Sequence, residues 1–265
     1  MQHYKRTWTK KFGKSEIYKR ENSACQKVEI DMLRLADGES KLYREADKEY
    51  ALVILGGKCD VVGETFSFEN VGKRKNVFDG AATCIYVPCN MPFTVKARGG
   101  EVQICVSKSP CTEIFEPVLI RPEDVVIKNL GKPGWEREAH FILDERVRSH
   151  MLYIGEAFVK GGQWASYPPH KHDDDNMPTE AETEEIYYYE FQKPQGFGIQ
   201  RVYTKEGDVD ETYIVKSGDF VEIPRGYHPF HAAPGYDNYY LWIMAGKDRG
   251  FFMTTDDDHA WLNKA

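Results

Sequence analysis

The chain has 265 residues, which is long enough for one large domain or two smaller ones that each bury a core. A hydrophobic content of 41% with 13% aromatic residues is typical of a globular protein. The formal net charge of −7 argues against nucleic-acid binding. No apolar run approaches the roughly 18 residues of a membrane span, and no apolar stretch follows the basic start. We therefore expect a cytoplasmic protein without a signal peptide.

Short segments rich in Val, Ile, Tyr and Phe dominate the chain. Turn sequences such as LGGK, KEGD and KSGD separate many of them, and no long segment has the helical period of about 3.6 residues. This pattern predicts an all-β fold of antiparallel sandwiches or barrels. In chain order the clearest segments are YALVIL (50–55), CIYVPC (84–89), FTVKAR (93–98), VQICVS (102–107), HMLYIGEAFV (150–159), EIYYYEF (185–191), GIQRVYT (198–204), FVEIPRG (220–226) and YYLWIMAG (239–246).

The two halves of this pattern resemble each other. Glu49 precedes YALVIL and Glu185 precedes IYYYEF, and each glutamate lies 39 positions before a proline, Pro88 or Pro224. Both pairs are offset by 136 residues, about half the chain. We therefore predict a duplicated β domain, with an N-terminal copy in residues 1–130 and a C-terminal copy in residues 131–265.

Candidate metal ligands gather in the C-terminal copy. In SYPPHKHD, His170 and His172 are two positions apart, so a β-strand would place both imidazoles on one face. The next strand begins with Glu184 and Glu185, and either could add a carboxylate. Neutral imidazoles with a carboxylate suit Zn, Mn, Fe, Co or Ni.

The segment PRGYHPFH offers a fourth ligand, either His228 or His231. Their odd spacing places them on opposite faces of a regular strand, so only one can join the site. At the offset of 136, His228 corresponds to Pro92, and the segment GESKLYREADKEY ahead of the N-terminal glutamate has no histidine. We expect a metal in the C-terminal copy only.

These residues carry a family resemblance. Gly162 followed by His170-x-His172 and a later glutamate resembles the first cupin motif, and GDFVEIPRGYH (218–228) resembles the second. Together with EEIYYYEF, GFGIQRVYT and GYHPFHAAPGYDNYYLWIMAG, they are similar to the 5-deoxyglucuronate isomerases of myo-inositol breakdown over residues 160–262. Those enzymes are bicupins related to the 4-deoxy-5-ketouronate isomerases. The resemblance thus implies two tandem cupin-type, jelly-roll-like antiparallel β-barrels.

The resemblance also implies a ligand set. The cupin pattern assigns the metal to four residues: His170, His172, Glu185 and His228. Glu185 is chosen because it aligns with Glu49, which leaves Glu184 as a solvated neighbour. The cofactor would be a divalent metal, Zn or Mn, with Fe or Ni as further options.

The activity implied is that of an aldose–ketose isomerase, converting 5-deoxy-glucuronate to 5-dehydro-2-deoxy-gluconate through a metal-assisted enediolate mechanism. The alternatives are a cupin Fe(II) dioxygenase and a non-catalytic sugar-binding bicupin. We expect a small deoxy-uronate substrate, no nucleic-acid or membrane partner, and leave a homo-oligomer open.

Three residues are candidates for binding the sugar acid: Arg201, Tyr203 and Tyr187. Counting from Glu185 places Tyr187 on the interior face of its strand. Arg201 and Tyr203 share a face, and an arginine inside a barrel would bind a uronate carboxylate through a bidentate pair. The alternative is a surface Arg201 with Gln200 pointing inward.

The remaining charged and reactive segments are assigned elsewhere. EREAH, with Arg137 and His140, is expected in the inter-domain region, and the tail TTDDDHAWLNKA in solvent. The six cysteines form no CxxC pair, so we expect buried, reduced thiols and neither disulfides nor a zinc site.

Overall fold

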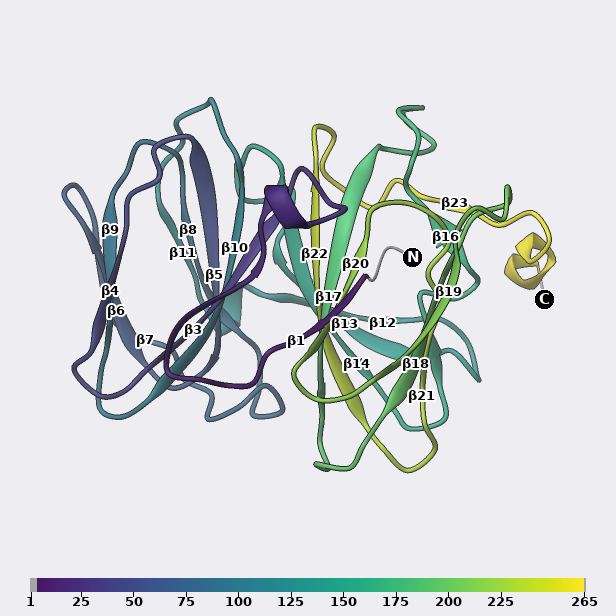
Figure 1. Ribbon diagram of the computed structural model, residues 1–265, viewed down its shortest axis with the longest axis horizontal. Helices are drawn as coiled ribbons and strands as arrows, with labels where there is room; N and C mark the ends of the chain where they lie inside the picture. Colours follow the sequence, from purple (N-terminus) through teal and green to yellow (C-terminus); the bar gives the residue numbers. More distant parts are fainter. Residues whose placement is uncertain (1–3, 265) are drawn as a thin grey trace.

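The computed structural model describes residues 4–264, and over this range the chain folds into four layers of β-sheet (Figure 1). Every pair of neighbouring strands is antiparallel, and the helices are three short 3-10 turns, η1 (Arg20–Asn22), η2 (Pro122–Asp124) and η3 (Ala260–Asn263). The all-β prediction is confirmed. No helix in the described part of the chain is long and apolar enough to cross a bilayer.

The first two layers come from the first half of the chain (Figure 1). The outer sheet has the order β4 (Ser40–Tyr43), β9 (Phe93–Ala97), β6 (Cys59–Gly63), β7 (Ser67–Val71). The sheet beside it has the order β11 (Val118–Ile120), β8 (Thr83–Val87), β5 (Lys48–Gly56), β10 (Val102–Pro110), β3 (Glu29–Leu35), β2 (Gly13–Tyr18).

The other two layers form the second half of the molecule. The inner sheet has the order β1 (Lys5–Thr7), β20 (Asp219–Ile223), β17 (Thr183–Phe191), β22 (Asn238–Gly246), β14 (Leu152–Val159), β13 (Arg137–Leu143), β12 (Val126–Leu130). The outer sheet has the order β15 (Trp164–Ala165), β21 (Phe230–Ala232), β18 (Gly198–Tyr203), β19 (Asp210–Val215), and β16 (His170–Lys171) pairs with β23 (Thr254–Thr255) beside it.

Three apolar cores separate the four layers. One fills the first barrel around Leu52 and Phe93, and another fills the second barrel around Phe230 and Tyr240. The third lies between the two inner sheets and includes Tyr188 and residues from both halves. Strands of the inner sheets are therefore buried on both faces, which explains why β22 is an almost unbroken apolar run.

The predicted boundary after residue 130 does not match the sheets. β1 pairs with β20, with Lys5 opposite Val221, and β12 pairs with β13, with Val126 opposite Phe141. Both strands belong to the first predicted domain by sequence and to the sheet of the second half by hydrogen bonding. Each end of the first half is thus tied into the second.

The repeat is present, with a slip of one residue in one strand. β8 and β20 are offset by 136 residues, as are β10 and β22. In β5, however, Tyr50 pairs with Val87, whereas in β17 Glu185 pairs with Ile223. Tyr50 is therefore the counterpart of Glu185, and the predicted alignment of Glu185 with Glu49 is wrong, because a slip of one position exchanges the two faces of a strand.

Glu49 and Glu184 are the true counterparts, and each reaches into the opposite half. Glu184 Oε2 accepts hydrogen bonds from the backbone N–H groups of Gln26 (2.7 Å) and Lys27 (2.6 Å). Glu49 accepts from the backbone N–H groups of residues 150–152 at 2.7–2.9 Å. The expectation that Glu184 is a solvated neighbour is therefore wrong.

Candidate metal centre

Three predicted ligands meet inside the second barrel. Glu185, near the start of β17, points its Oε2 to within 3.1 Å of His172 Nε2 and 3.2 Å of His228 Nε2. All three side chains are buried, and their ligand atoms lie within 4.8 Å of one another. Within residues 4–264 this is the only group of three such side chains placed to hold a metal ion. The N-terminal barrel has the aromatic trio Tyr43, Tyr50 and Phe93 packed in its interior instead.

His170 lies at the edge of this group. Its ring centroid is 4.9 Å from that of His228, and it lines the same cavity as His172 and Glu185. Its strand, β16, is held by β23, in which Thr255 pairs with His170. His170, His172 and Glu185 therefore line one cavity and His228 packs against them, with His170 slightly outside the tight cluster.

The backbone orients all three imidazoles in the same way. The Nδ1 atoms of His172, His228 and His170 lie 2.7, 2.9 and 3.3 Å from the carbonyl oxygens of Thr183, Gly226 and Pro168. A carbonyl can only accept, so each Nδ1 carries the hydrogen and each Nε2 is left with a free lone pair.

These lone pairs create a need for a cation. The Nε2 atoms of His172 and His228 both converge on the Glu185 carboxylate, so three acceptors share one buried space. His228 Nε2 has no hydrogen-bond partner although Glu185 Oε2 lies 3.2 Å away, because with the hydrogen on Nδ1 both atoms are acceptors. A buried acceptor left unpaired is costly, and a divalent cation satisfies all three at once. The residues present therefore fit a metal ion.

The electrostatics of Glu185 and His170 agree with this, whereas the pKa of His172 is raised, because burial would lower it but the Glu185 carboxylate outweighs that effect. Burial alone would raise the pKa of Glu185, but the adjacent imidazoles of His172 and His228 lower it to about 2. Burial, followed by the neighbouring His228 and His172, lowers the pKa of His170 well below its usual value. Glu185 is thus ionised and His170 neutral at pH 7, the forms that bind metals.

The choice between His228 and His231 follows the strand geometry. His231 lies on β21 opposite Trp164, and the two rings are 4.8 Å apart. Only His228 reaches the cluster.

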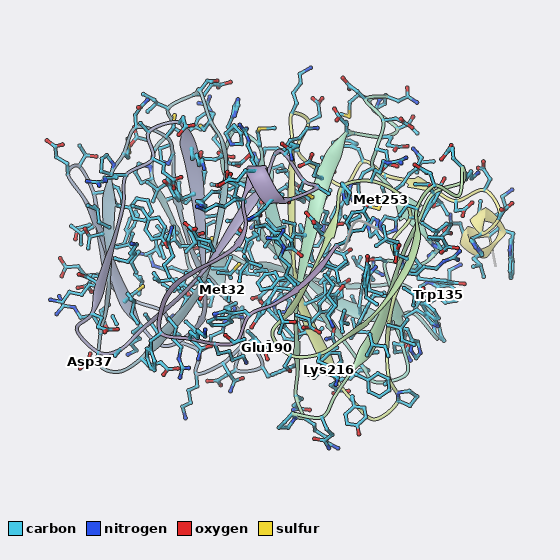
Figure 2. The ribbon with its side chains drawn as sticks, viewed as in Figure 1. Met32, Asp37, Trp135, Glu190, Lys216 and Met253 are labelled. Atoms are coloured by element: carbon cyan, nitrogen blue, oxygen red, sulfur yellow. The ribbon has the colours of Figure 1, made fainter. Side chains whose placement is uncertain are left out.

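A cavity of about 460 Å³ opens from the ligands. Tyr187 lines it as predicted, with its ring 4.7 Å from Tyr240 and its hydroxyl 2.7 Å from Ser166 Oγ. Trp242 forms part of the wall, and Gly155 makes room for it, since a Cβ at that position would lie 2.1 Å from the indole. Trp135 and Met253, which also line the cavity, are seen in the second half of the molecule in Figure 2.

Arg201 and Tyr203 do not line this cavity, which corrects their assignment to the substrate. The Arg201 guanidinium forms a bidentate pair with Asp210 at 2.8 and 2.9 Å, and its side chain is 44% exposed. Gln200 points inward instead, accepting from Tyr189 Oη at 2.6 Å and donating to the carbonyl of His228 at 2.7 Å. The residues of β18 that face the barrel interior are therefore those predicted to face outward, and the reverse.

The C-terminal segment packs against the site, contrary to the expectation of a solvated tail. Asp256 is buried, accepts a hydrogen bond from Tyr203 Oη at 2.7 Å and donates its backbone N–H to Pro169. Further along, Leu262 and Asn263 line the cavity. So does Arg137, which was expected in the inter-domain region.

Comparison with known proteins places this chain in a family. The model of the KduI/IolB family matches residues 6–262. The chain belongs to the KduI/IolB family. Curated relatives named 5-deoxy-glucuronate isomerase include one from Geobacillus kaustophilus, 38% identical over 91% of this chain and 88% of its own. Another, from Bacillus licheniformis, is 39% identical over 92% and 90%.

Solved structures agree with this KduI/IolB assignment. An IolB-like protein of Salmonella typhimurium LT2 is 33% identical, with a TM-score of 0.94 over 98% of this chain and 99% of that one. The oxalate decarboxylase of Lactobacillus farciminis is 11% identical, with a TM-score of 0.71 over 100% and 91%. Because the oxalate decarboxylases are bicupins, the fold is that of a bicupin, as predicted.

Proposed function

We propose that this chain is a metal-dependent isomerase that converts 5-deoxy-glucuronate to 5-dehydro-2-deoxy-gluconate, a step of inositol catabolism. Its relatives bear the name of that isomerase. The observation that carries the proposal is the convergence of His172 Nε2, His228 Nε2 and the Glu185 carboxylate at a cavity of about 460 Å³, a size typical of small-molecule sites. We further propose a cytoplasmic enzyme and leave a homo-oligomer open.

His170, His172, Glu185 and His228 would hold the ion, and Zn or Mn suits this mixed imidazole and carboxylate set, with Fe and Ni as further candidates. The oxalate decarboxylase of Bacillus subtilis, which is similar in fold, has Mn(II) centres. When bound, the metal would polarise the carbonyl and the adjacent hydroxyl of the sugar and so acidify the hydrogen on the carbon that bears this hydroxyl.

The chain's own residues supply the surroundings of the reaction. Burial raises the pKa of Tyr187 well above its usual value, so its hydroxyl stays protonated and can donate to a sugar oxygen. Ser166 holds that hydroxyl in place from 2.7 Å. Trp242 and Tyr240 cover the cavity wall and exclude water from the reacting carbons.

Incubating the metal-loaded protein with 5-deoxy-glucuronate in D₂O tests this proposal by NMR. We expect the ketose product, with deuterium at the former aldehyde carbon if the proton exchanges with solvent, and no product after chelation. Oxygen consumption without ketose would favour the dioxygenase, and binding without turnover would favour a sugar-binding protein.

A further inference from the structure

Arg137 is placed inside the barrel by the alternation of its strand. β13 begins at Arg137, and two residues that follow on the same face, Ala139 and Phe141, are part of the apolar core of the second barrel. The acidic neighbours Glu136 and Glu138 are exposed. Arg137 is half-buried and lines the cavity that contains the candidate metal ligands.

No protein group neutralises this guanidinium. Within residues 4–264, the Arg137 side chain makes no hydrogen bond and no ion pair, and only its backbone is bonded, in the sheet. It also borders a neighbouring cavity of about 620 Å³ that Glu136, Glu138 and Asp237 line. Glu138 lies 2.8 Å from His140 Nε2 and Asp237 pairs with Lys160 at 2.7 Å, while the exposed Glu136 forms no ion pair with Arg137. An arginine that is half-buried and unpaired has the geometry to take an anionic ligand in a bidentate manner.

The charge of Arg137 reaches the reaction site. After burial, it is the largest influence on the pKa of Tyr240, which lines the same cavity, and it lowers that pKa. The only carboxylate among the cavity-lining residues is Glu185, which is occupied by His172 and His228. The cavity therefore offers a metal-type site for oxygens and a separate, unmatched positive charge.

We propose that Arg137 binds the carboxylate of the sugar acid and thereby fixes which end of the chain meets the metal ligands. This inference rests on the proposed function, since it takes the substrate to be a uronate with an aldehyde at one end and a carboxylate at the other. With the carboxylate on Arg137, the aldehyde end lies toward His170, His172 and Glu185. Arg137 is thus a specificity-determining residue for acids over neutral sugars.

The test compares two substrates, 5-deoxy-glucuronate and the neutral aldose in which a hydroxymethyl group replaces the carboxylate. For Arg137→Gln we expect kcat/KM on the acid to fall roughly 10- to 100-fold, the usual range for a charged hydrogen bond, while kcat/KM on the neutral sugar stays within about twofold. Arg137→Lys should recover part of the loss as a point charge without the bidentate geometry. Arg201→Gln, which removes an exposed arginine outside the cavity, is the matched control and should change neither value.

Calorimetric titration of each variant with glucarate, and with the uncharged polyol of the same length, reads binding without turnover. Glucarate should bind the wild type and the Arg201 variant, and bind Arg137→Gln at least about 10-fold more weakly. An equal loss of kcat/KM on both sugars, or unchanged glucarate binding by Arg137→Gln, would overturn the assignment. If the wild type binds glucarate through Arg137 but does not isomerise the uronate, the proposed function fails and the anion site stands.

Discussion

Single hydrogen bonds determine how the site is oriented. Gln200 donates to the carbonyl of His228 at 2.7 Å and so fixes the loop that carries this candidate ligand. Thr183 accepts from His172 Nδ1 through its backbone oxygen at 2.7 Å. Such outer contacts set the tautomer and direction of metal-binding imidazoles, and losing one typically lowers metal affinity about 10- to 100-fold.

Substitutions at two tyrosines distinguish a residue that lines the cavity from one that lies outside it. Tyr187→Phe removes the hydroxyl that lies 2.7 Å from Ser166 inside the cavity, so kcat/KM should fall about 10-fold, the value of roughly one hydrogen bond, with metal content unchanged. Tyr203→Phe removes a hydroxyl bonded to Asp256 outside the cavity and should leave kcat/KM within about twofold. Steady-state kinetics with metal analysis checks both. Equal losses in the two variants would return Tyr203 to the site.

At this scale the sequence predicted more of the candidate metal ligands than of the residues that line the cavity. The spacing of His170 and His172, and the odd spacing of His228 and His231, matches the observed faces because alternation is local. Alternation does not say which of two successive residues points inward when both are polar, as Gln200 and Arg201 are. That choice depends on how β18 packs against β19 and β21, and the spacing of residues in the sequence carries no information about this packing.

Among the strands, β5 and β17 show how a duplicated element diverges. Their one-residue slip places Tyr50 in the first barrel where Glu185 stands in the second, and an aromatic trio occupies the first interior. The glutamate one position earlier in each strand keeps a structural role, capping backbone N–H groups of the other half. The repeat offset was visible in the sequence, but the slip was not, because it appears only in the pairing register.

The Glu49 cap can be tested by its effect on stability. Its buried carboxylate accepts three backbone N–H groups of residues 150–152 and the Tyr86 hydroxyl. Glu49→Ala leaves these donors unpaired and should lower the free energy of unfolding by about 3 kcal/mol or more, measured by urea titration. Glu64→Ala, at an exposed position, should change it by less than about 0.5 kcal/mol. If Glu49→Ala left the free energy of unfolding unchanged, water would have to replace the carboxylate as the acceptor.

Taken as a whole, the molecule is two barrels joined through a continuous apolar core. β1 and β12 from the first half extend the sheet of the second, which the sequence boundary missed because both strands are short and lie next to the predicted join or at the chain end. Inside the shared core, Arg74 of the first half pairs with Glu156 of the second at 2.5 Å, with side chains 1% and 0% exposed. Tyr239 also donates to this carboxylate at 2.7 Å.

A double-mutant cycle measures this buried pair. Arg74→Met strands the charge of Glu156 and should cost about 3–5 kcal/mol of unfolding free energy. Arg74→Met combined with Glu156→Leu removes both charges and should recover at least half of that loss, because the desolvated charge is gone. Urea titration of the four proteins checks the coupling. Additive losses would show that the two side chains act independently.

The central claim, a metal site in the second barrel formed by His170, His172, Glu185 and His228, is tested most directly by metal content per chain. His228→Ala removes a ligand and should weaken metal binding by more than about 100-fold, with loss of isomerisation of 5-deoxy-glucuronate. His231→Ala, which alters only the contact with Trp164 on the outer sheet, should retain one ion per chain and most of the activity. Metal retained in His228→Ala but lost in His231→Ala, or a second ion bound in the N-terminal barrel, would contradict the account.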